Sequence, residues 1–501
     1  MDRDGETEVD IDIVGSDEDI AIIGHDDVTT YNEDNILPEK PNVISKLRAW
    51  LEPTPYDLMN GEFRRHLASH LQGTGEWLSD TAPYQDWHRG TEQGLLWIKG
   101  IPGSGKSVFA ATLADQLAQE GHPVLYFFFR QIIDANHKPD QLLRDWLDQI
   151  IEYSPPLQQQ LKSYMDSNGN MSRSIQSFGV DTLWKHLKTA LSHMPRVYLV
   201  VDALDEMDMG NNEFLQSLAR LGSWKPAQVK ILITSRPVSN VEMPLREAKV
   251  PILQVRLEER FVDVDIATFV QRGLETSSIT ADDQIWIKEA VPGRANGLFL
   301  YAKLAMDAFL EPNANVQQIL KALPVDLNTM YTDLLREHRR RSGAPDDIQL
   351  LILSWVTHAS RPLRLLEMAE IVAVTYDRQD IYRDIKAAKD LVRIACGPLL
   401  EILPDETVSV VHHSFTEFLL GSTRSADSTN FPILKTGPTH EKLALSCFRY
   451  LKSGCLDVPM EDKDDGPTTT GIAELRKKRI AKRLEFPFFE YAVKEWSSHC
   501  V

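Results

Sequence analysis

Continuous apolar runs recur through the middle of the chain, and helical patterns separate them. A strand buried on both faces reads as an unbroken apolar run, whereas a half-exposed strand alternates apolar and polar residues. We therefore expect a parallel sheet flanked by helices, an α/β fold. The predicted strands are residues 95–99, 123–129, 197–201, 229–233 and, as a fifth candidate, 251–255.

Helical periodicity replaces the strand pattern beyond about residue 258. Helices are predicted over 262–274, 282–290, 298–309 and 316–320, with sharp breaks at Pro292–Gly293 and Leu323–Pro324. A second helical block covers 330–376 and breaks at Arg361–Pro362. Residues 392–402 and 407–411 then suggest a helix followed by a short hairpin, which is the pattern of a winged helix. The remainder, 440–501, is mostly helical apart from a polar loop at 461–470.

Composition and length bound the class of protein. At 501 residues the chain is too long for one hydrophobic core. Its residues are 43% hydrophobic and 25% charged, as in soluble globular proteins, and no run approaches the roughly 18 apolar residues of a membrane span. The first residues are acidic and contain no apolar segment of the signal-peptide type. Four scattered cysteines without metal-ligand spacing suit a reducing compartment, so we expect a cytoplasmic protein.

Negative charge is concentrated at the N-terminus. The net charge is −19, and residues 1–40 contribute −12 of it through fourteen Asp or Glu and two Lys or Arg. We expect a disordered acidic leader, although the apolar residues at 9–14 and 20–23 leave open a small strand-forming signalling segment. The acidic balance argues against a generic nucleic-acid binder.

These changes of pattern divide the chain into six predicted regions. They are an acidic leader (1–45), a helical module (46–92), an α/β nucleotide-binding domain (93–257), a helical domain (258–328), a winged-helix-like domain (329–425) and a helical C-terminal region (426–501).

The strand at 95–99 runs into G-x-x-x-x-G-K-S, the pattern of a phosphate-binding loop. Glycines let successive backbone N–H groups turn towards a phosphate, and a helix expected over 107–117 directs its positive end at the same anion. Lys106 reaches the β- and γ-phosphates, and the Ser107 hydroxyl suits Mg²⁺. The predicted nucleotide-binding residues here are Gly100, Ile101, Pro102, Gly103, Ser104, Gly105, Lys106, Ser107 and Val108.

A second acidic motif follows the strand at 197–201. Asp202 ends that strand, where a carboxylate can hold Mg²⁺ opposite Ser107. Asp205 and Glu206 lie one turn further on and can orient or deprotonate the attacking water, so both are predicted catalytic residues. On its own the pattern could equally be a strand followed by an acidic helix cap.

Arg236 ends the strand at 229–233. If this strand lies between the first and third strands, Arg236 faces the γ-phosphate and reports whether it is present. The alternative is an arginine that caps the strand by pairing with an acid.

Together these motifs make the chain resemble the NACHT group of signal-transducing P-loop NTPases, and within it fungal NLR-like proteins of the STAND class whose NTPase domain is similar to the N-terminal domain of nephrocystin-3. The resemblance covers residues from about 48 to 499. The segments that carry it are GLLWIKGIPGSGKS (94–107), LVVDALDE (199–206), ITSRP (233–237), ANGLFLYA (295–302), SWVTHASRPL (354–363) and VHHSFTEFL (411–419).

The resemblance implies an ATP/ADP switch in signal transduction and innate immunity. In such proteins ADP locks the NTPase core against the helical and winged-helix domains, and exchange for ATP releases them so that protomers assemble. A winged-helix histidine contacts the ADP phosphates, and by its position ahead of Ser-Phe-x-x-Phe-Leu this is His412, with His413 as second candidate. Members of the family often carry repeats after the equivalent of 486–496, and this sequence ends at Val501.

Three functions remain open at this stage. The first is a switch that binds ATP or ADP with Mg²⁺, hydrolyses slowly and self-associates in the ATP state. GTP is not excluded, because the loop reads phosphates rather than the base. The second is a conventional P-loop ATPase or phosphoryl-transfer enzyme, and the third is a non-hydrolysing scaffold.

Overall fold

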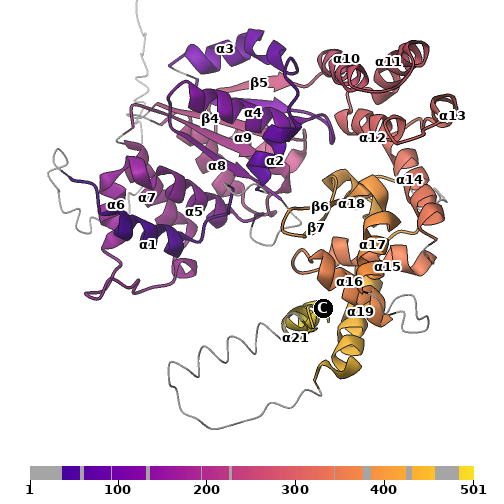
Figure 1. Cartoon of the computed structure of the whole chain (residues 1–501). Helices are drawn as coiled ribbons and strands as arrows, with labels where there is room; N and C mark the ends of the chain where they lie inside the picture. The colour runs from indigo at the N-terminus through magenta and orange to yellow at the C-terminus, as the bar shows by residue number, and fades with distance from the viewer. Residues whose placement is uncertain are drawn as a thin grey trace, which may run out of the picture.

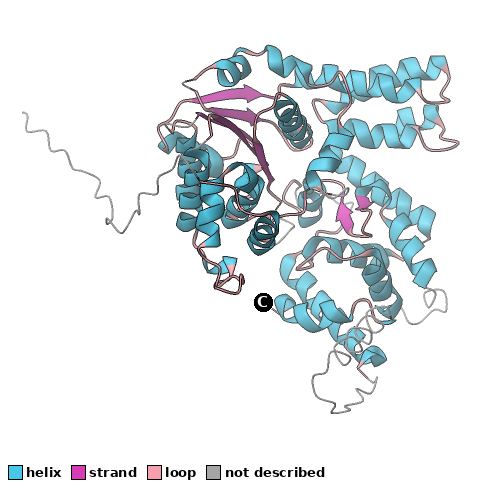
Figure 2. Ribbon diagram, turned by 60° about the vertical axis from the view of Figure 1, so that its left-hand side comes forward, coloured by secondary structure: helices cyan, strands magenta, loops and turns pink. Residues whose placement is uncertain are grey.

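A five-stranded parallel sheet forms the centre of the N-terminal half of the described chain (Figures 1 and 2). The computed structural model describes residues 36–56, 61–91, 93–130, 136–192, 194–224, 228–343, 345–375, 385–424, 431–456 and 485–500. The strand order is β2-β3-β4-β1-β5. The strands are β1 (Leu95–Lys99), β2 (Val124–Phe128), β3 (Arg196–Asp202), β4 (Gln228–Ser235) and β5 (Ile252–Arg256).

This order confirms the α/β prediction, including the placement of β4 between β1 and β3. The register pairs Lys99 of β1 with Ser235 of β4, and Phe128 of β2 with Asp202 of β3. Because parallel strands end at the same edge of a sheet, the loops after β1, β2, β3 and β4 open on one side. This edge carries the polar residues that the sequence places after each strand.

Nine helices of the described chain surround or precede this sheet, and helices lie on both of its sides (Figure 2). Helix α4 packs across β2, β3 and β4, while α2 lies against α4 and α3 lies against β1 and β5. The helices are α1 (Pro41–Leu51), α2 (Glu62–Ser69), α3 (Ala82–Arg89), α4 (Lys106–Gln119), α5 (Pro139–Ile150), α6 (Pro155–Lys162), α7 (Val180–Ser192), α8 (Asn212–Leu221) and α9 (Ser239–Glu247).

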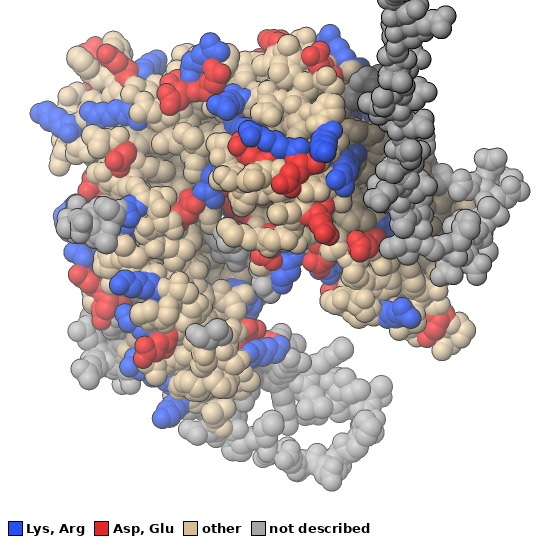
Figure 3. Space-filling model, turned by 180° about the vertical axis from the view of Figure 1, so that it is seen from behind, with Lys and Arg blue, Asp and Glu red and all other residues tan. Residues whose placement is uncertain are grey.

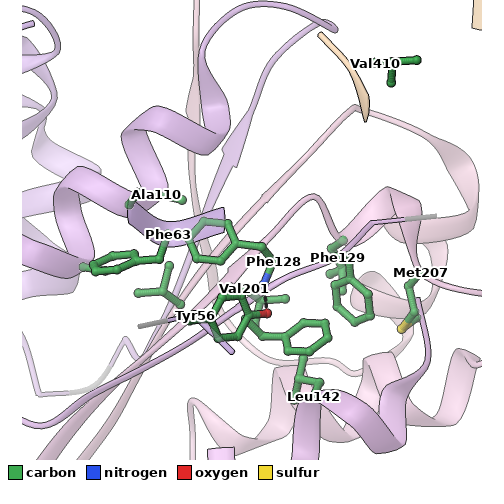
Figure 4. Packing of buried hydrophobic residues seen from close by; sticks show 14 of the residues in the cluster. Tyr56, Phe63, Ala110, Phe128, Phe129, Leu142, Val201, Met207 and Val410 are labelled. Carbon is green, nitrogen blue, oxygen red and sulfur yellow. Dashed lines mark hydrogen bonds between the residues drawn. The ribbon is translucent and has the colours of Figure 1, made fainter. Parts of the chain in front are cut away.

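An aromatic cluster ties the segment before the sheet to β2 (Figure 4). Phe128 donates its backbone N–H to the hydroxyl of Tyr56 at 3.1 Å. Phe63 of α2 stacks on Tyr126 with ring centroids 4.3 Å apart. Aromatic pairs of this kind stabilise a core beyond the area that they bury. The helices of residues 46–92 therefore share a hydrophobic core with the NTPase sheet.

Four helices beside β5 form the predicted helical domain (Figure 1). The predicted break at Pro292–Gly293 is wrong, because α11 continues through Pro292 to Ala295. Val291 and Ala295 are buried, and α11 packs against α10 and α12, so tertiary packing outweighs the local cost of a proline. The chain turns instead at Asn296 and Gly297, which both have positive φ. The helices are α10 (Glu259–Glu275), α11 (Ala281–Ala295), α12 (Phe299–Phe309) and α13 (Val316–Ala322).

A helical unit with a two-stranded antiparallel hairpin follows, as the winged-helix prediction requires. The predicted break near Arg361 is present between α15 and α16, and a further break lies between α14 and α15. The elements are α14 (Leu327–Ser342), α15 (Asp346–His358), α16 (Leu365–Thr375), α17 (Ile385–Ala395), β6 (Leu400–Ile402), β7 (Val408–Val410) and α18 (His413–Leu420).

Helices α19 (Thr436–Tyr450) and α21 (Phe489–Glu495) end the described chain. Phe488, Tyr491 and Trp355 pack together and join this region to α15. The predicted acidic leader, apart from 36–45, and the predicted polar loop at 461–470 lie outside the described residues. Within the described part of the chain, no helix has both the length and the apolar character that crossing a bilayer requires.

Candidate functional site

The loop between β1 and α4 depends on glycine for its shape. Gly103 and Gly105 have φ values of 78° and 89°, a region in which a Cβ atom is strained. A Cβ on Gly100 would lie 2.6 Å from Oγ of Ser104, whose hydroxyl donates a 2.9 Å hydrogen bond to the carbonyl of Ile101. The loop is thus a backbone cradle at the N-terminus of α4, and unpaired N–H groups at a helix start favour an anion.

Lys106 lies over this cradle. Its Nζ donates to the carbonyl oxygens of Gly100 at 3.0 Å and Ile101 at 2.9 Å. Burial lowers the pKa of Lys106, and the nearby carboxylates of Asp205 and Asp202 oppose that effect. A partly desolvated ammonium group held by neutral carbonyls is well placed to exchange them for a phosphate.

Asp202 and Ser107 lie together at the end of β3, as the sequence predicts. Asp202 accepts hydrogen bonds from the hydroxyl of Thr234. Burial raises the pKa of Asp202, whereas nearby His66 and hydrogen bonds from Thr234 and Ser107 lower it. The carboxylate and the Ser107 hydroxyl are hard oxygen ligands within hydrogen-bonding reach of each other, a donor set that fits Mg²⁺.

Arg236 is held between two carboxylates. Its Nε lies 2.5 Å from Oδ2 of Asp205, and its backbone N–H donates to Oδ1 at 3.0 Å. Its Nη1 pairs with Glu417 of α18, in the winged helix. Burial lowers the pKa of Arg236, but the hydrogen bonds to Asp205 and Glu417 raise it by more than burial lowers it. The net pKa is raised, so the guanidinium stays charged. The structure shows Arg236 paired with two acids, and its partner Glu417 in the winged helix was not predicted. The γ-phosphate role of Arg236 stays a prediction.

The two acids after Asp202 point in different directions. Ala203 has a φ of 52° and turns the chain into the short helix Leu204–Glu206. Glu206 lines the cavity beside the phosphate loop, whereas Asp205 is engaged by Arg236 and, among the described residues, does not line it. The roles assigned to Asp205 and Glu206 stay predictions, and the geometry places only Glu206 at the cavity.

Arg130 lines the cavity although the sequence reading did not single it out. It lies two residues beyond β2, and its Nε is 2.8 Å from Oε1 of Glu62 in α2. The sequence contains a pattern that could have identified Arg130. It is a polar residue after an apolar strand, and the same pattern identified Asp202 and Arg236.

His412 approaches the same cavity from the winged helix. It is the N-cap of α18, and its Nδ1 accepts the backbone N–H of Ser414 at 3.1 Å. Burial first, and then the charge of Lys106, lower the pKa of His412 to about 3. The ring is therefore neutral with its proton on Nε2, which can donate to a phosphate oxygen. His413 lines the cavity too, and its Nε2 lies 3.8 Å from Glu417.

The cavity has a volume of about 910 Å³ and is bounded by the NTPase region with the helices before it, the helical domain and the winged helix. That volume falls in the range of about 300–1,000 Å³ typical of small-molecule sites. At one end Asp265 of α10 accepts the backbone N–H of Gly75 at 3.0 Å and the indole N–H of Trp77 at 2.9 Å. Of the predicted loop residues, those that line the cavity are Gly103, Gly105, Lys106, Ser107 and Val108.

A second ionic contact crosses the mouth of the cavity. Glu401 of β6 pairs with Arg65 of α2, and its other oxygen lies 3.5 Å from Nζ of Lys303 in α12. All three side chains line the cavity. The winged helix is thus joined to the NTPase region by Arg236–Glu417 and by Arg65–Glu401.

This sheet order, the phosphate loop after β1 and the acid at the end of β3 define a P-loop NTPase, here joined to a winged helix. The comparisons agree, since residues 73–236 match the family "Nephrocystin 3, N-terminal" and residues 346–431 match "GPI inositol-deacylase, winged helix domain". Residues 73–236 therefore form a P-loop NTPase domain similar to the nephrocystin 3 N-terminal domain, and residues 346–431 form a winged helix.

A curated fungal protein is similar to a large part of this chain. The vegetative incompatibility protein HET-E-1 of Podospora anserina is 27% identical over 361 residues, which cover 69% of this chain. The match covers 26% of HET-E-1, so the chain spans about a quarter of that relative's length.

Solved structures with a similar arrangement are distant in sequence. The Walker-type ATPase of Pyrococcus abyssi is 13% identical with a TM-score of 0.35, and covers 68% of this chain and 95% of its own. Cdc6p of Pyrobaculum aerophilum is 12% identical with a TM-score of 0.33, and covers 70% and 94%. The fold assignment rests on the strand order and the phosphate loop.

Proposed function

We propose that the chain is an ATP/ADP-controlled switch, in which exchange or slow hydrolysis of the nucleotide governs a conformational change and self-assembly. The observation that carries this proposal is the cavity wall. The phosphate loop of the NTPase domain, α12 of the helical domain and His412 of the winged helix all face one cavity. A nucleotide bound there would touch parts of the chain that can move relative to each other, so ATP and ADP can favour different arrangements.

The proposed roles follow from the position of each side chain. The phosphate loop and Lys106 bind the phosphates, and Ser107 with Asp202 would hold Mg²⁺, which supplies charge neutralisation when bound. Glu206 orients the attacking water. Asp205 fixes Arg236, whose release from Glu417 would accompany detachment of the winged helix.

His412 is proposed to favour the ADP state. Its Nδ1 is occupied by the start of α18, so Nε2–H is the donor directed at the phosphates. A hydrogen bond from the winged helix to bound ADP holds that domain against the NTPase core. The family resemblance and the cavity wall both support this assignment.

The experiment is to identify the nucleotide released on denaturing the purified protein and to compare its mass in solution with ADP and with ATP. Lys106→Ala should abolish nucleotide retention, because the phosphates lose their principal cation. Lys185→Ala, an exposed lysine of α7 that lies away from the loop, is the matched control. Unchanged nucleotide in the Lys106→Ala protein would overturn the site assignment.

Turnover separates the switch from the other two functions. Steady hydrolysis well above about one per minute, or phosphoryl transfer to an added acceptor, would favour a conventional P-loop enzyme. Absence of nucleotide from both the native and the reconstituted protein would favour the scaffold. Lys106, Ser107 and Asp202 all line the cavity, which supports nucleotide binding over the scaffold.

A further inference from the structure

Arg130 is a partly buried arginine that borders two cavities. Its side chain is 19% exposed, and it lines both the nucleotide cavity and a second cavity of about 1220 Å³ between the NTPase region and the winged helix. An arginine can therefore change its direction here without moving the backbone of β2.

The charges around Arg130 place it beside the metal-binding side of the site. Burial lowers its pKa, but the carboxylates of Glu62, Glu206 and Asp202 raise it overall. Glu206 and Asp202 are the acids that line the cavity after β3, and β2 pairs with β3 so that Phe128 lies opposite Asp202. The γ-phosphate of a triphosphate, which extends from the phosphate loop towards Asp202 and its metal ion, would end near this guanidinium.

Glu62 has a second cationic or hydrogen-bonding partner that remains if Arg130 leaves. Its Oε1 is 2.8 Å from Nε of Arg130 and 3.1 Å from Nε2 of His66. Although burial raises the pKa of Glu62, Arg130 and His66 together hold it well below the usual value. Departure of Arg130 therefore does not leave the carboxylate without a donor, which reduces the cost of the exchange.

Arg236, unlike Arg130, is not free to turn towards a bound nucleotide. Two carboxylates, Asp205 and Glu417, occupy its guanidinium on separate nitrogens, and Arg236 is not among the described residues that line the cavity. Among the described residues, the arginines that line the cavity are Arg65 and Arg130, and Arg65 is paired with Glu401 of β6.

Resting on the proposed function, we infer that Arg130 reads the γ-phosphate. When a diphosphate is bound, Arg130 stays paired with Glu62. When a triphosphate is bound, its guanidinium turns to the γ-phosphate, and Glu62 remains hydrogen-bonded to His66. An arginine suits this task because its planar fork can donate two parallel hydrogen bonds to one phosphate.

Helix α2 transmits the exchange to the winged helix. Glu62 and Arg65 are one turn apart on α2, and Arg65 holds Glu401 of β6. Release of Arg130 from Glu62 removes one anchor of this helix, which weakens the contact between α2 and β6. The γ-phosphate thereby acts on the winged helix through a route separate from Arg236 and His412.

The test is the ratio of two affinities in the nucleotide-free full-length protein. Calorimetry with Mg²⁺ would compare ADP with the non-hydrolysable triphosphate AMPPNP for wild type, Arg130→Gln, Glu62→Gln and the control Arg64→Gln, an exposed residue of α2 outside the cavity. We expect Arg130→Gln to weaken AMPPNP at least tenfold and ADP by less than twofold. Glu62→Gln should shift the ratio towards AMPPNP, and Arg64→Gln should leave it unchanged.

An unchanged ratio in Arg130→Gln, or equal weakening of both nucleotides, would overturn the inference. If Arg130→Gln does not fold, Glu62→Gln decides, because it keeps the arginine and an unchanged ratio again contradicts the role. Failure of the wild-type protein to bind either nucleotide would instead overturn the proposed function itself.

Discussion

Three polar side chains at the ends of adjacent strands define the chemistry of this protein at the residue scale. Arg130 follows β2, Asp202 ends β3 and Arg236 follows β4. Each is paired in the structure, with Glu62, Thr234 and Asp205 respectively. A nucleotide or metal ion bound at this edge would therefore compete with these existing partners.

His412→Ala should weaken ADP binding by about 10- to 150-fold, because a hydrogen bond to a charged phosphate is worth about 1.5–3 kcal/mol. It should also raise the fraction of oligomer in light scattering after size exclusion. Alanine removes the N-cap of α18 as well, so His412→Asn is the matched control: asparagine can cap the helix but lacks the Nε2 donor. ADP affinity and elution that match the wild type in both variants would make His412 a structural residue.

Residues that act within one short motif were predictable from sequence, and residues that act through distant partners were not. The phosphate loop and Asp202 stand in contiguous patterns whose chemistry is local. Glu417 was missed because its partner Arg236 is 181 positions away. Nothing in the segment around Glu417 marks it as different from an exposed helical glutamate until α18 is packed beside β4.

At the scale of elements, the buried strands were predicted almost to the residue, since strands with both faces covered read as unbroken apolar runs. The helix ends were less accurate. Pro292 predicts a break, but burial of Val291 and Ala295 keeps α11 continuous across it. The local sequence pattern was therefore sufficient to predict where the strands lie. The end of α11 could not be predicted in this way, because it depends on packing between α10, α11 and α12.

Asp145 of α5 binds the segment after α1 and makes the stability of the fold depend on pH. Its Oδ1 accepts the backbone N–H of Thr54 at 2.9 Å and the amide of Gln141 at 2.8 Å, while Oδ2 is buried and has no hydrogen-bond partner among the residues that the structure describes. Burial raises the pKa of Asp145 to about 7. The folded protein thus keeps a proton that the unfolded chain releases near pH 4, so this contribution to stability is lost as the pH rises from about 4 to about 7.

Asp145→Asn should remove that dependence. At pH 8 it should stabilise the protein by about 2–4 kcal/mol relative to wild type, with little difference at pH 4.5. Urea unfolding followed by fluorescence at both pH values measures this, and Asp115→Asn at the surface of α4 is the control. Parallel pH profiles for Asp145→Asn and wild type would show that the carboxyl is ionised in the fold.

At the scale of the whole molecule, two ionic contacts hold the winged helix against the NTPase region: Arg236–Glu417 and Arg65–Glu401. Their side chains are partly buried, so salt screens them less than surface pairs. On the face shown in Figure 3, acidic and basic side chains are interspersed rather than gathered in a basic patch.

Glu417→Arg should detach the winged helix, because it places two guanidinium groups together and leaves Arg236 with Asp205 alone. We expect the radius of gyration from solution scattering to increase and the release of a fluorescent ADP analogue to accelerate about tenfold. The double variant Arg236→Glu with Glu417→Arg should recover part of the compact form. An unchanged radius and release rate in Glu417→Arg would exclude the contact as a restraint between domains.

The wall of the nucleotide cavity is built from residues as far apart in the chain as Glu62 and His413. In a switch of the proposed kind, a bound nucleotide leaves when one of these segments moves away from the others. The frequency of that opening then sets the dwell time of the nucleotide, so two variants of equal affinity can differ widely in dwell time. Such a switch acts as a timer, and side chains that never touch the nucleotide tune its interval.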